Sequence, residues 1–158
     1  MLLEKYKDVY LNISSILLIV LLSYAAVVKG YDLNLFQKQM TESPLIPLIL
    51  TDIISYVIPS FELLAVLLLF FQSTRFWGFI LSYFLMLFFS VYLIALLYLF
   101  GSNLPCACGG ILGEMGYKTH IIFNIFFTIL AFISTIITSY DNKIILFAKQ
   151  LDLSYSTN

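Results

Sequence analysis

Two cysteines separated by one residue are the side chains of this chain best suited to covalent chemistry. Cys106 and Cys108 follow Pro105 and precede two glycines, in a short segment between two long apolar runs. Thiol–disulfide exchange needs a thiolate, a leaving sulfur and access for a partner. Neighbouring cysteines supply the first two requirements and a loop supplies the third. The spacing therefore predicts a redox-active dithiol.

The short spacing favours a labile bridge over a structural one. Two extended residues separate the α-carbons by about 7 Å, the upper limit for a disulfide, so the chain must bend between the cysteines. Gly109 and Gly110 allow this bend, and a strained bridge is easily reduced. The alternatives are free structural thiols, a lipidated cysteine, or half of a metal site shared with another chain. Two sulfurs and one histidine fall short of a complete zinc or copper site, so no metal is predicted.

Three polar residues in apolar surroundings are candidates to assist the cysteines. His120, the sole histidine, begins the last apolar run, and Asn124 lies one helical turn further along the same face. The imidazole could stabilise a thiolate or accept its proton, or it could simply bond the loop backbone. Glu62 lies inside the second apolar run, where a carboxylate is costly unless it faces helices, water or a partner. It is either functional or bonded to a neighbouring helix or to the backbone freed by Pro59.

The remaining acids and aromatic residues carry weaker signals. Asp52 and Glu114 are expected to be solvated. The third apolar run, residues 76–100, is rich in phenylalanine and tyrosine and contains Trp77. Such a set could line a flat slot for a quinone, although helix packing and interfacial anchoring are its commoner roles. A quinone is therefore a candidate cofactor.

The composition places these residues in a membrane protein. The chain of 158 residues is 61% hydrophobic and only 11% charged, which is too little charge for a soluble domain of this size. Its length fits four spans of about 20 residues and no separate soluble domain. We predict one all-α integral membrane domain over residues 1–158, a four-helix bundle with spans at about 9–29, 45–72, 76–100 and 117–140. The first run lacks a small-x-small cleavage site and should remain as a span.

The polar connections and the second apolar run give further predictions of structure. Tyr31–Ser43 predicts an amphipathic segment in the membrane interface between the first two spans. Met1–Asp8 predicts a short interfacial helix, and the polar tail Asp141–Asn158 has its own amphipathic stretch. Pro59 interrupts the second run, and two interpretations stay open. Either an oblique segment Leu45–Ile58 is followed by a separate span Ser60–Phe71, or one tilted helix over residues 45–72 is kinked at Pro59.

Charge predicts the orientation and excludes a polyionic partner. A formal net charge of -1 gives no basic face for nucleic acid. With both termini in the cytoplasm, more basic residues lie inside than outside. The inner set is Lys5, Lys7, Arg75, Lys143 and Lys149, and the outer set is Lys29, at the end of the first span, with Lys38 and Lys118. This orientation puts the cysteine loop on the outer, periplasmic side of a bacterial inner membrane, where disulfides persist.

The order of motifs resembles the MauE/DoxX-like family of small redox-associated membrane proteins. The matching elements run along nearly the whole chain: Phe36–Met40, Ser43–Ile46, Ile58–Leu63, Pro105–Gly110 and His120–Asn124. The resemblance implies a DoxX-like four-helix bundle and a role in envelope thiol–disulfide traffic beside thioredoxin-like proteins. Its methylamine-utilisation members are associated with maturation of a disulfide-rich dehydrogenase. By position, Cys106 and Cys108 would be the redox pair, and Glu62, His120 and Asn124 would be motif positions.

These observations predict a membrane thiol–disulfide oxidoreductase, or an electron-relay component of one. Its partners would be the lipid bilayer and a thioredoxin-like or other envelope protein with exchangeable thiols. The alternative is a non-enzymatic subunit or assembly factor of a larger envelope transport or secretion complex, with structural cysteines. A small-molecule transporter is disfavoured, because few ionisable residues lie at membrane depth and no broken-helix pair is repeated.

Overall fold

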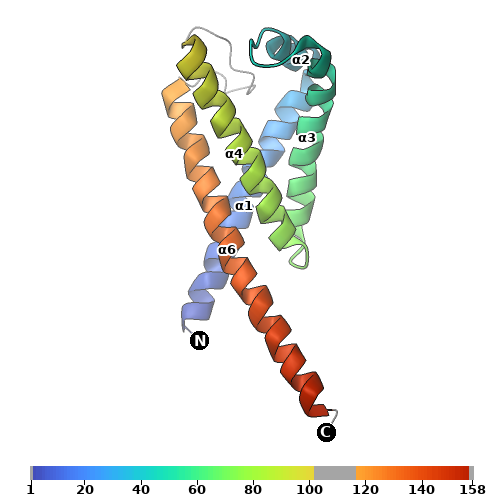
Figure 1. Ribbon diagram of the computed structural model, residues 1–158, viewed down its shortest axis with the longest axis vertical. Helices are drawn as coiled ribbons and strands as arrows, with labels where there is room; N and C mark the ends of the chain where they lie inside the picture. The colour runs from blue at the N-terminus through green and yellow to red at the C-terminus, as the bar shows by residue number, and fades with distance from the viewer. Residues whose placement is uncertain (1, 102–116, 157–158) are drawn as a thin grey trace.

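Five helices make up the described part of the chain, and four of them are long and apolar enough to cross a membrane (Figure 1). The computed structural model describes residues 2–101 and 117–156, and the side chains of residues 4–101 and 118–141. The helices are α1 Leu2–Tyr31, α2 Leu33–Thr41, α3 Leu48–Phe70, α4 Arg75–Phe100 and α6 Tyr117–Ser156. The described residues contain no strand. The predicted all-α fold with four spans is confirmed.

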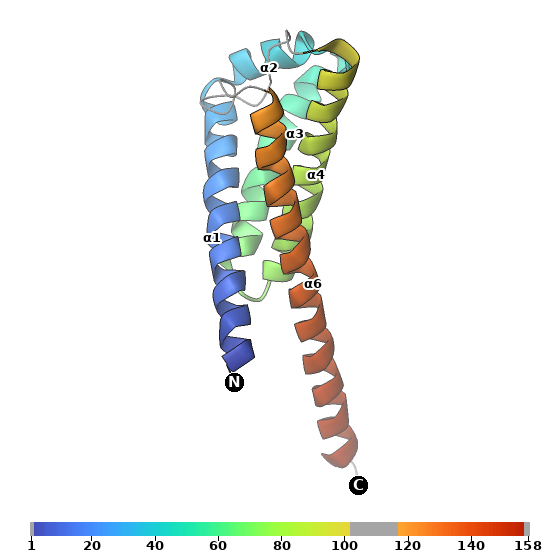
Figure 2. The same ribbon diagram turned by 90° about the vertical axis from the view of Figure 1, so that its left-hand side faces the viewer.

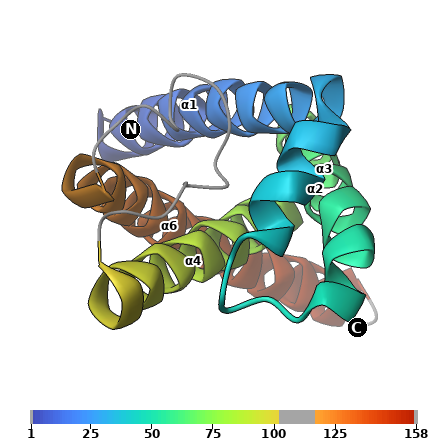
Figure 3. The same ribbon diagram turned by 90° about the horizontal axis from the view of Figure 1, so that it is seen from above.

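The spanning helices form a ring in the order α1, α3, α4, α6, in which consecutive helices contact one another and α6 returns to α1 (Figure 3). Neighbours in this ring run antiparallel wherever a short connection joins them, as at residues 71–74 between α3 and α4. The short helix α2 lies across one end of the bundle, where it contacts α3 and α1 (Figure 2). That end also holds the last turn of α1.

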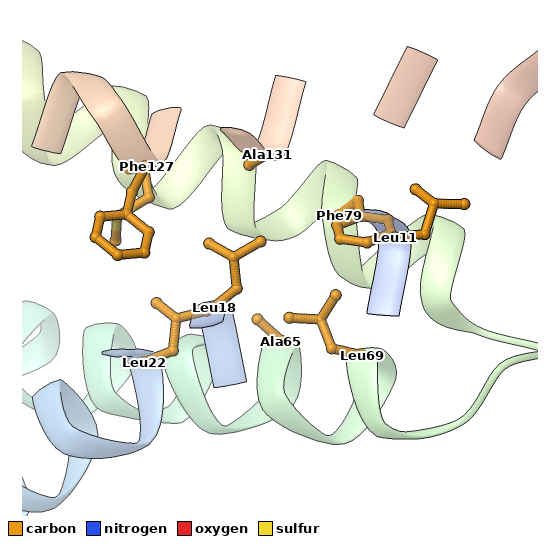
Figure 4. Close-up of a cluster of buried hydrophobic side chains, with 9 residues drawn as sticks. Leu11, Leu18, Leu22, Ala65, Leu69, Phe79, Phe127 and Ala131 are labelled. Atoms are coloured by element: carbon orange, nitrogen blue, oxygen red, sulfur yellow. The ribbon is translucent and has the colours of Figure 1, made fainter. Parts of the chain in front are cut away.

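The core between these helices is built from leucine, phenylalanine and alanine. The buried cluster, most of which Figure 4 labels, consists of Leu11, Leu18, Leu22, Ala65, Leu69, Phe79, Met86, Phe127 and Ala131. Small residues such as alanine let helix backbones approach closely in membrane bundles. The two buried serines of α4 need no distant partner, because Ser82 and Ser90 donate to carbonyls four residues earlier in the helix, each at 2.8 Å. Many large apolar side chains, such as Ile16, Val20 and Phe84, face outward, as expected of a surface covered by lipid.

Polar contacts join the helices at their ends. Lys7 Nζ lies 2.6 Å from Asp141 Oδ1, which joins α1 to α6. Arg75 Nη1 donates to Asn12 Oδ1 at 2.8 Å, which joins α4 to α1. At the end of the bundle where α2 lies, Tyr92 of α4 donates to Ser43 Oγ at 2.8 Å. These contacts fix the register of the helices that position the site described below.

The amphipathic segment between the first two spans is helix α2, and its apolar side already has a partner. Asp32 caps the helix, since its Oδ1 accepts from the Leu35 backbone N–H at 2.9 Å. Phe36 and Met40 are buried against Ile46 and Ile54. The polar side chains of the segment are available to face the membrane–water interface.

Three boundaries differ from the expectations. Residues 2–8 belong to α1 itself, and the described part of the tail continues α6 to Ser156, since neither stretch contains the glycine or proline that would end a helix. α3 runs unbroken through Pro59, so the separate oblique segment Leu45–Ile58 is wrong. In a membrane, neighbouring helices and hydroxyl groups compensate for the hydrogen bond that proline removes.

Gly78 of α4 lies against the backbone at the end of α3, so a larger residue there is expected to disturb the packing of the two helices. A β-carbon at this position would lie 2.7 Å from the backbone nitrogen of Leu69 and 3.0 Å from the carbonyl carbon of Leu68. Gly78→Ala is therefore expected to lower the free energy of unfolding by about 1–3 kcal/mol, because backbone atoms must move to admit the methyl group. Unfolding in mixed detergent micelles measures the change. Gly30→Ala in α1 is the control, since no atom lies within 4 Å of its added methyl; equal effects of the two variants would contradict the packing argument.

Candidate functional site

A small pocket with polar walls lies inside the bundle where all four spanning helices meet. Its volume is about 30 Å³. We call it the inner pocket, and its lining residues are Leu21, Ala25 and Lys29 of α1, Glu62 of α3, Met86 and Phe89 of α4, and His120 and Asn124 of α6. Since the lining is otherwise apolar, the four polar residues are concentrated at one place in a hydrophobic bundle.

The strongest interaction in the inner pocket is an ion pair between α1 and α3. Lys29 Nζ donates to Glu62 Oε1, and the two side chains are 3% and 0% exposed. The ammonium group also lies 4.5 Å from the centre of the Phe89 ring and 5.8 Å from that of Phe36. A buried charge pair must overcome the desolvation of both ions, so it is weak as a device for stability alone. Its presence points to a functional requirement for charge at this depth.

The directions of the helices explain how these two residues meet. Side chains of a helix lean toward its N-terminus. Because α1 and α3 are antiparallel, Lys29 leans back from the end of α1 into the bundle, and Glu62 leans toward it along α3. The long aliphatic stem of lysine covers the remaining distance and packs on apolar neighbours. The ammonium group is thereby brought to a carboxylate that lies deep in α3.

The Glu62 carboxylate uses one oxygen for this pair and leaves the other unpaired. Within the described residues, Oε2 is buried and has no hydrogen-bond partner. A buried carboxylate oxygen without a donor is costly, and such atoms ordinarily bond water or a ligand. The inner pocket therefore has an unmet acceptor on its wall.

His120 and Asn124 bring α6 into the site. They lie in the first two turns of α6, one turn apart, and are 3% and 6% exposed. Both line the inner pocket beside Lys29 and Glu62. An imidazole next to a carboxylate and an ammonium group can exchange a proton with either through a short chain of hydrogen bonds.

Three of the predicted site residues, Glu62, His120 and Asn124, thus lie around one pocket although they come from two helices. Cys106 and Cys108 lie outside the described residues, as does Glu114. The segment that carries the cysteines joins α4 to α6, and His120 follows it by only a few residues. Asp52 is exposed, as expected of a solvated acid.

Lys29 is a residue of the site that was not predicted from the sequence. The predicted first span ends at Lys29, with this lysine counted among the outer basic residues, whereas α1 continues to Tyr31 and Lys29 is buried. The physical reason is the carboxylate of Glu62, which provides a counter-ion inside the bundle. The pair could have been suspected from the sequence, because one apolar run contains a lysine and the next contains an acid that could serve as its counter-ion.

The aromatic residues of α4 do not gather in a single slot. Phe79 is buried in the core, whereas Trp77, Phe84 and Phe88 are exposed on the outside. Phe88 and Tyr92 line an apolar hollow of about 310 Å³ between α3 and α4, together with Ile46 and Ile54. The inner pocket itself is too small for a quinone ring, since ligand pockets measure about 300–1,000 Å³.

Comparison with protein families identifies the family of the chain. The family model described as methylamine utilisation protein MauE matches residues 7–137. The chain belongs to the MauE family. The match includes all of α3 and α4, most of α1, the first part of α6 and both cysteines, so the predicted family is confirmed and the protein is a multi-pass membrane protein of this family. Comparison with curated proteins and with solved structures gave no match.

Proposed function

We propose that this MauE-family protein is a thiol–disulfide oxidoreductase of the bacterial cytoplasmic membrane, or the electron-relay component of one. Cys106 and Cys108 form its redox pair. The observation that carries the proposal is the buried cluster of Lys29, Glu62, His120 and Asn124, whose α6 members directly follow the cysteine-bearing segment. Such a cluster combines a base, an acid and a positive charge, which are the groups that thiol chemistry uses.

The proposed reaction is exchange with a dithiol or disulfide of an envelope protein, such as a thioredoxin-like partner. A thiolate of one protein attacks the disulfide of the other, one S–S bond breaks as a mixed disulfide forms, and the second thiol resolves it. Two electrons pass from the dithiol to the disulfide. His120 accepts the proton of the attacking thiol, and the leaving sulfur takes a proton from water at the membrane surface. His120 must therefore release its proton before the next exchange.

The burial of Lys29 supports the proposed orientation. With Lys29 neutralised by Glu62, the basic residues assigned to the outer side are Lys38 and Lys118, while the cytoplasmic set is unchanged. The bias toward basic residues in the cytoplasm is therefore larger than the sequence suggested. The proposal places both termini in the cytoplasm and the cysteines at the periplasmic face.

A quinone is the candidate electron acceptor from the membrane. The hollow lined by Ile46, Ile54, Phe88 and Tyr92 has an apolar lining and the volume of a small-ligand site. A bound quinone would accept two electrons and two protons. The residues of this hollow would hold its ring at the lipid-facing surface of α3 and α4.

Trapping with single-cysteine variants tests the function. The chain has two cysteines, so Cys106→Ala and Cys108→Ala each leave one thiol. One of them is expected to accumulate a mixed disulfide with an envelope protein, which reductant releases, because the resolving thiol is missing. Alkylation and mass spectrometry identify the adduct.

The double variant Cys106→Ser/Cys108→Ser is the control, and it should trap nothing. If neither single variant forms an adduct and the thiol status of the envelope is unchanged, the proposal fails. Survival of full activity in the double variant would instead favour the alternative of a non-enzymatic subunit of a larger envelope complex.

A further inference from the structure

Lys29 lies between two hollows, one inside the bundle and one at its surface. The second, which we call the outer hollow, has a volume of about 360 Å³ and lies at the corner between α1 and α2. Its lining residues are Val27, Val28, Lys29, Tyr31, Asp32, Leu35, Phe36 and Gln39. Lys29 thus lines both the outer hollow and the inner pocket, and it is nearly fully buried between them.

The inner pocket has the size and chemistry of a site for one water molecule. A cavity needs about 10–15 Å³ to hold a water, and this one offers about 30 Å³. The unpaired, fully buried Oε2 of Glu62 supplies one hydrogen-bond acceptor on its wall. Asn124 and His120 also line the pocket, so a water would have polar neighbours on both α3 and α6.

We propose that Lys29 and Glu62, with a water molecule on Glu62 Oε2, form a proton relay that connects the outer hollow with His120. This inference deepens the proposed function, because it assigns the route by which His120 gains and loses its proton. A proton passes from His120 through the water to the Glu62 carboxylate. Lys29 then releases a proton to water in the outer hollow and regains one from the Glu62 carboxyl group, so the ion pair returns to its starting charges. The reverse sequence returns a proton to His120.

The groups that face the Glu62 carboxylate limit which residues take part. α1 contributes Lys29 and α6 contributes His120. α4 contributes Met86 and Phe89, neither of which titrates. α2 presents the Phe36 ring to Lys29, and its cap residue Asp32 lines the outer hollow. Among the described residues, the route therefore uses one lysine, one glutamate and one histidine.

Infrared difference spectroscopy on the full chain in lipid vesicles tests the relay. When the external pH is stepped, a protonated-carboxyl band of Glu62 is expected to rise and fall, and to shift when the solvent is D₂O. The band should be lost in Glu62→Gln and in the double variant Lys29→Met/Glu62→Leu. It should remain in Glu42→Gln, which removes an exposed acid. Gln39→Trp, which fills the outer hollow, should slow the shift in D₂O.

Several outcomes would overturn the relay. These are a band absent at every pH, a band that persists in Glu62→Gln, a band that does not exchange in D₂O, or an unchanged exchange rate in Gln39→Trp. Trapping on the same preparations separates the two proposals. If the mixed disulfide is trapped but the Glu62 carboxyl band does not change with pH, the relay alone is overturned. If the band changes with pH but no mixed disulfide is trapped, the proposed function is overturned and the proton route is supported.

Discussion

Glu62→Leu alone is expected to lower the free energy of unfolding by about 3–5 kcal/mol, and adding Lys29→Met is expected to recover most of that loss. Removing the glutamate leaves the Lys29 ammonium group buried without a counter-ion, since its side chain is 3% exposed. Replacing both residues by apolar ones of similar volume removes the two desolvation penalties together. The double variant should therefore be far more stable than the sum of the single effects predicts.

Unfolding of the four proteins in mixed detergent micelles measures this double-mutant cycle. Glu42→Leu is the matched control, because Glu42 pairs with Lys38 at 4.0 Å on an exposed face of α2 and should change stability by less than about 1 kcal/mol. Additive losses in the double variant would contradict the ion pair. A stable double variant that has lost thiol exchange would indicate that the pair serves function rather than folding.

His120→Ala is expected to slow thiol–disulfide exchange by about 100-fold, because general acid–base groups contribute at least that much to proton transfer. The cysteines remain, so exchange should continue at the lower rate and gain speed as bulk pH rises and thiolates form. The wild-type rate should depend less steeply on pH, since the inner pocket holds a base near the cysteine-bearing segment. Stopped-flow oxidation of a reporter dithiol, followed over a range of pH, measures both effects.

Thr119→Ala is the control for His120, because Thr119 is the preceding, exposed residue in the same turn of α6. It should leave the rate and its pH profile unchanged. A His120→Ala protein that keeps the wild-type profile would assign His120 a structural role. A lower rate with an unchanged profile shape would also contradict its role as the proton acceptor.

The four spans could be predicted from the sequence. An uncharged apolar run of this length lies in the membrane, and a helix is one of the few structures that pair all of its backbone N–H and C=O groups there. It also singled out Glu62, His120 and Asn124, since each is a polar residue at a costly depth. The role of Lys29 could not be predicted in the same way. A lysine near the end of an apolar run ordinarily reaches solvent, and its actual partner is on another helix.

The helix boundaries were predicted less accurately than the spans, for a different physical reason. Pro59 is a strong signal for interruption in a soluble helix, but packing in the bundle holds α3 in one piece from Leu48 to Phe70. Sequence periodicity also gives no information on which helices are neighbours. The inner pocket could therefore be recognised only once the ring order α1, α3, α4, α6 was known. Tertiary packing decided both features.

The reduction potential of the Cys106–Cys108 pair tests the central claim most directly. The purified chain would be equilibrated in buffers of defined redox potential, alkylated, and weighed by mass spectrometry. Thiol exchange as proposed predicts one two-electron transition, with both thiols changing together, at a midpoint of about −270 to −120 mV, the range of known protein dithiol exchangers. Two thiols that stay free in every buffer, or that react independently of each other, would contradict a redox pair.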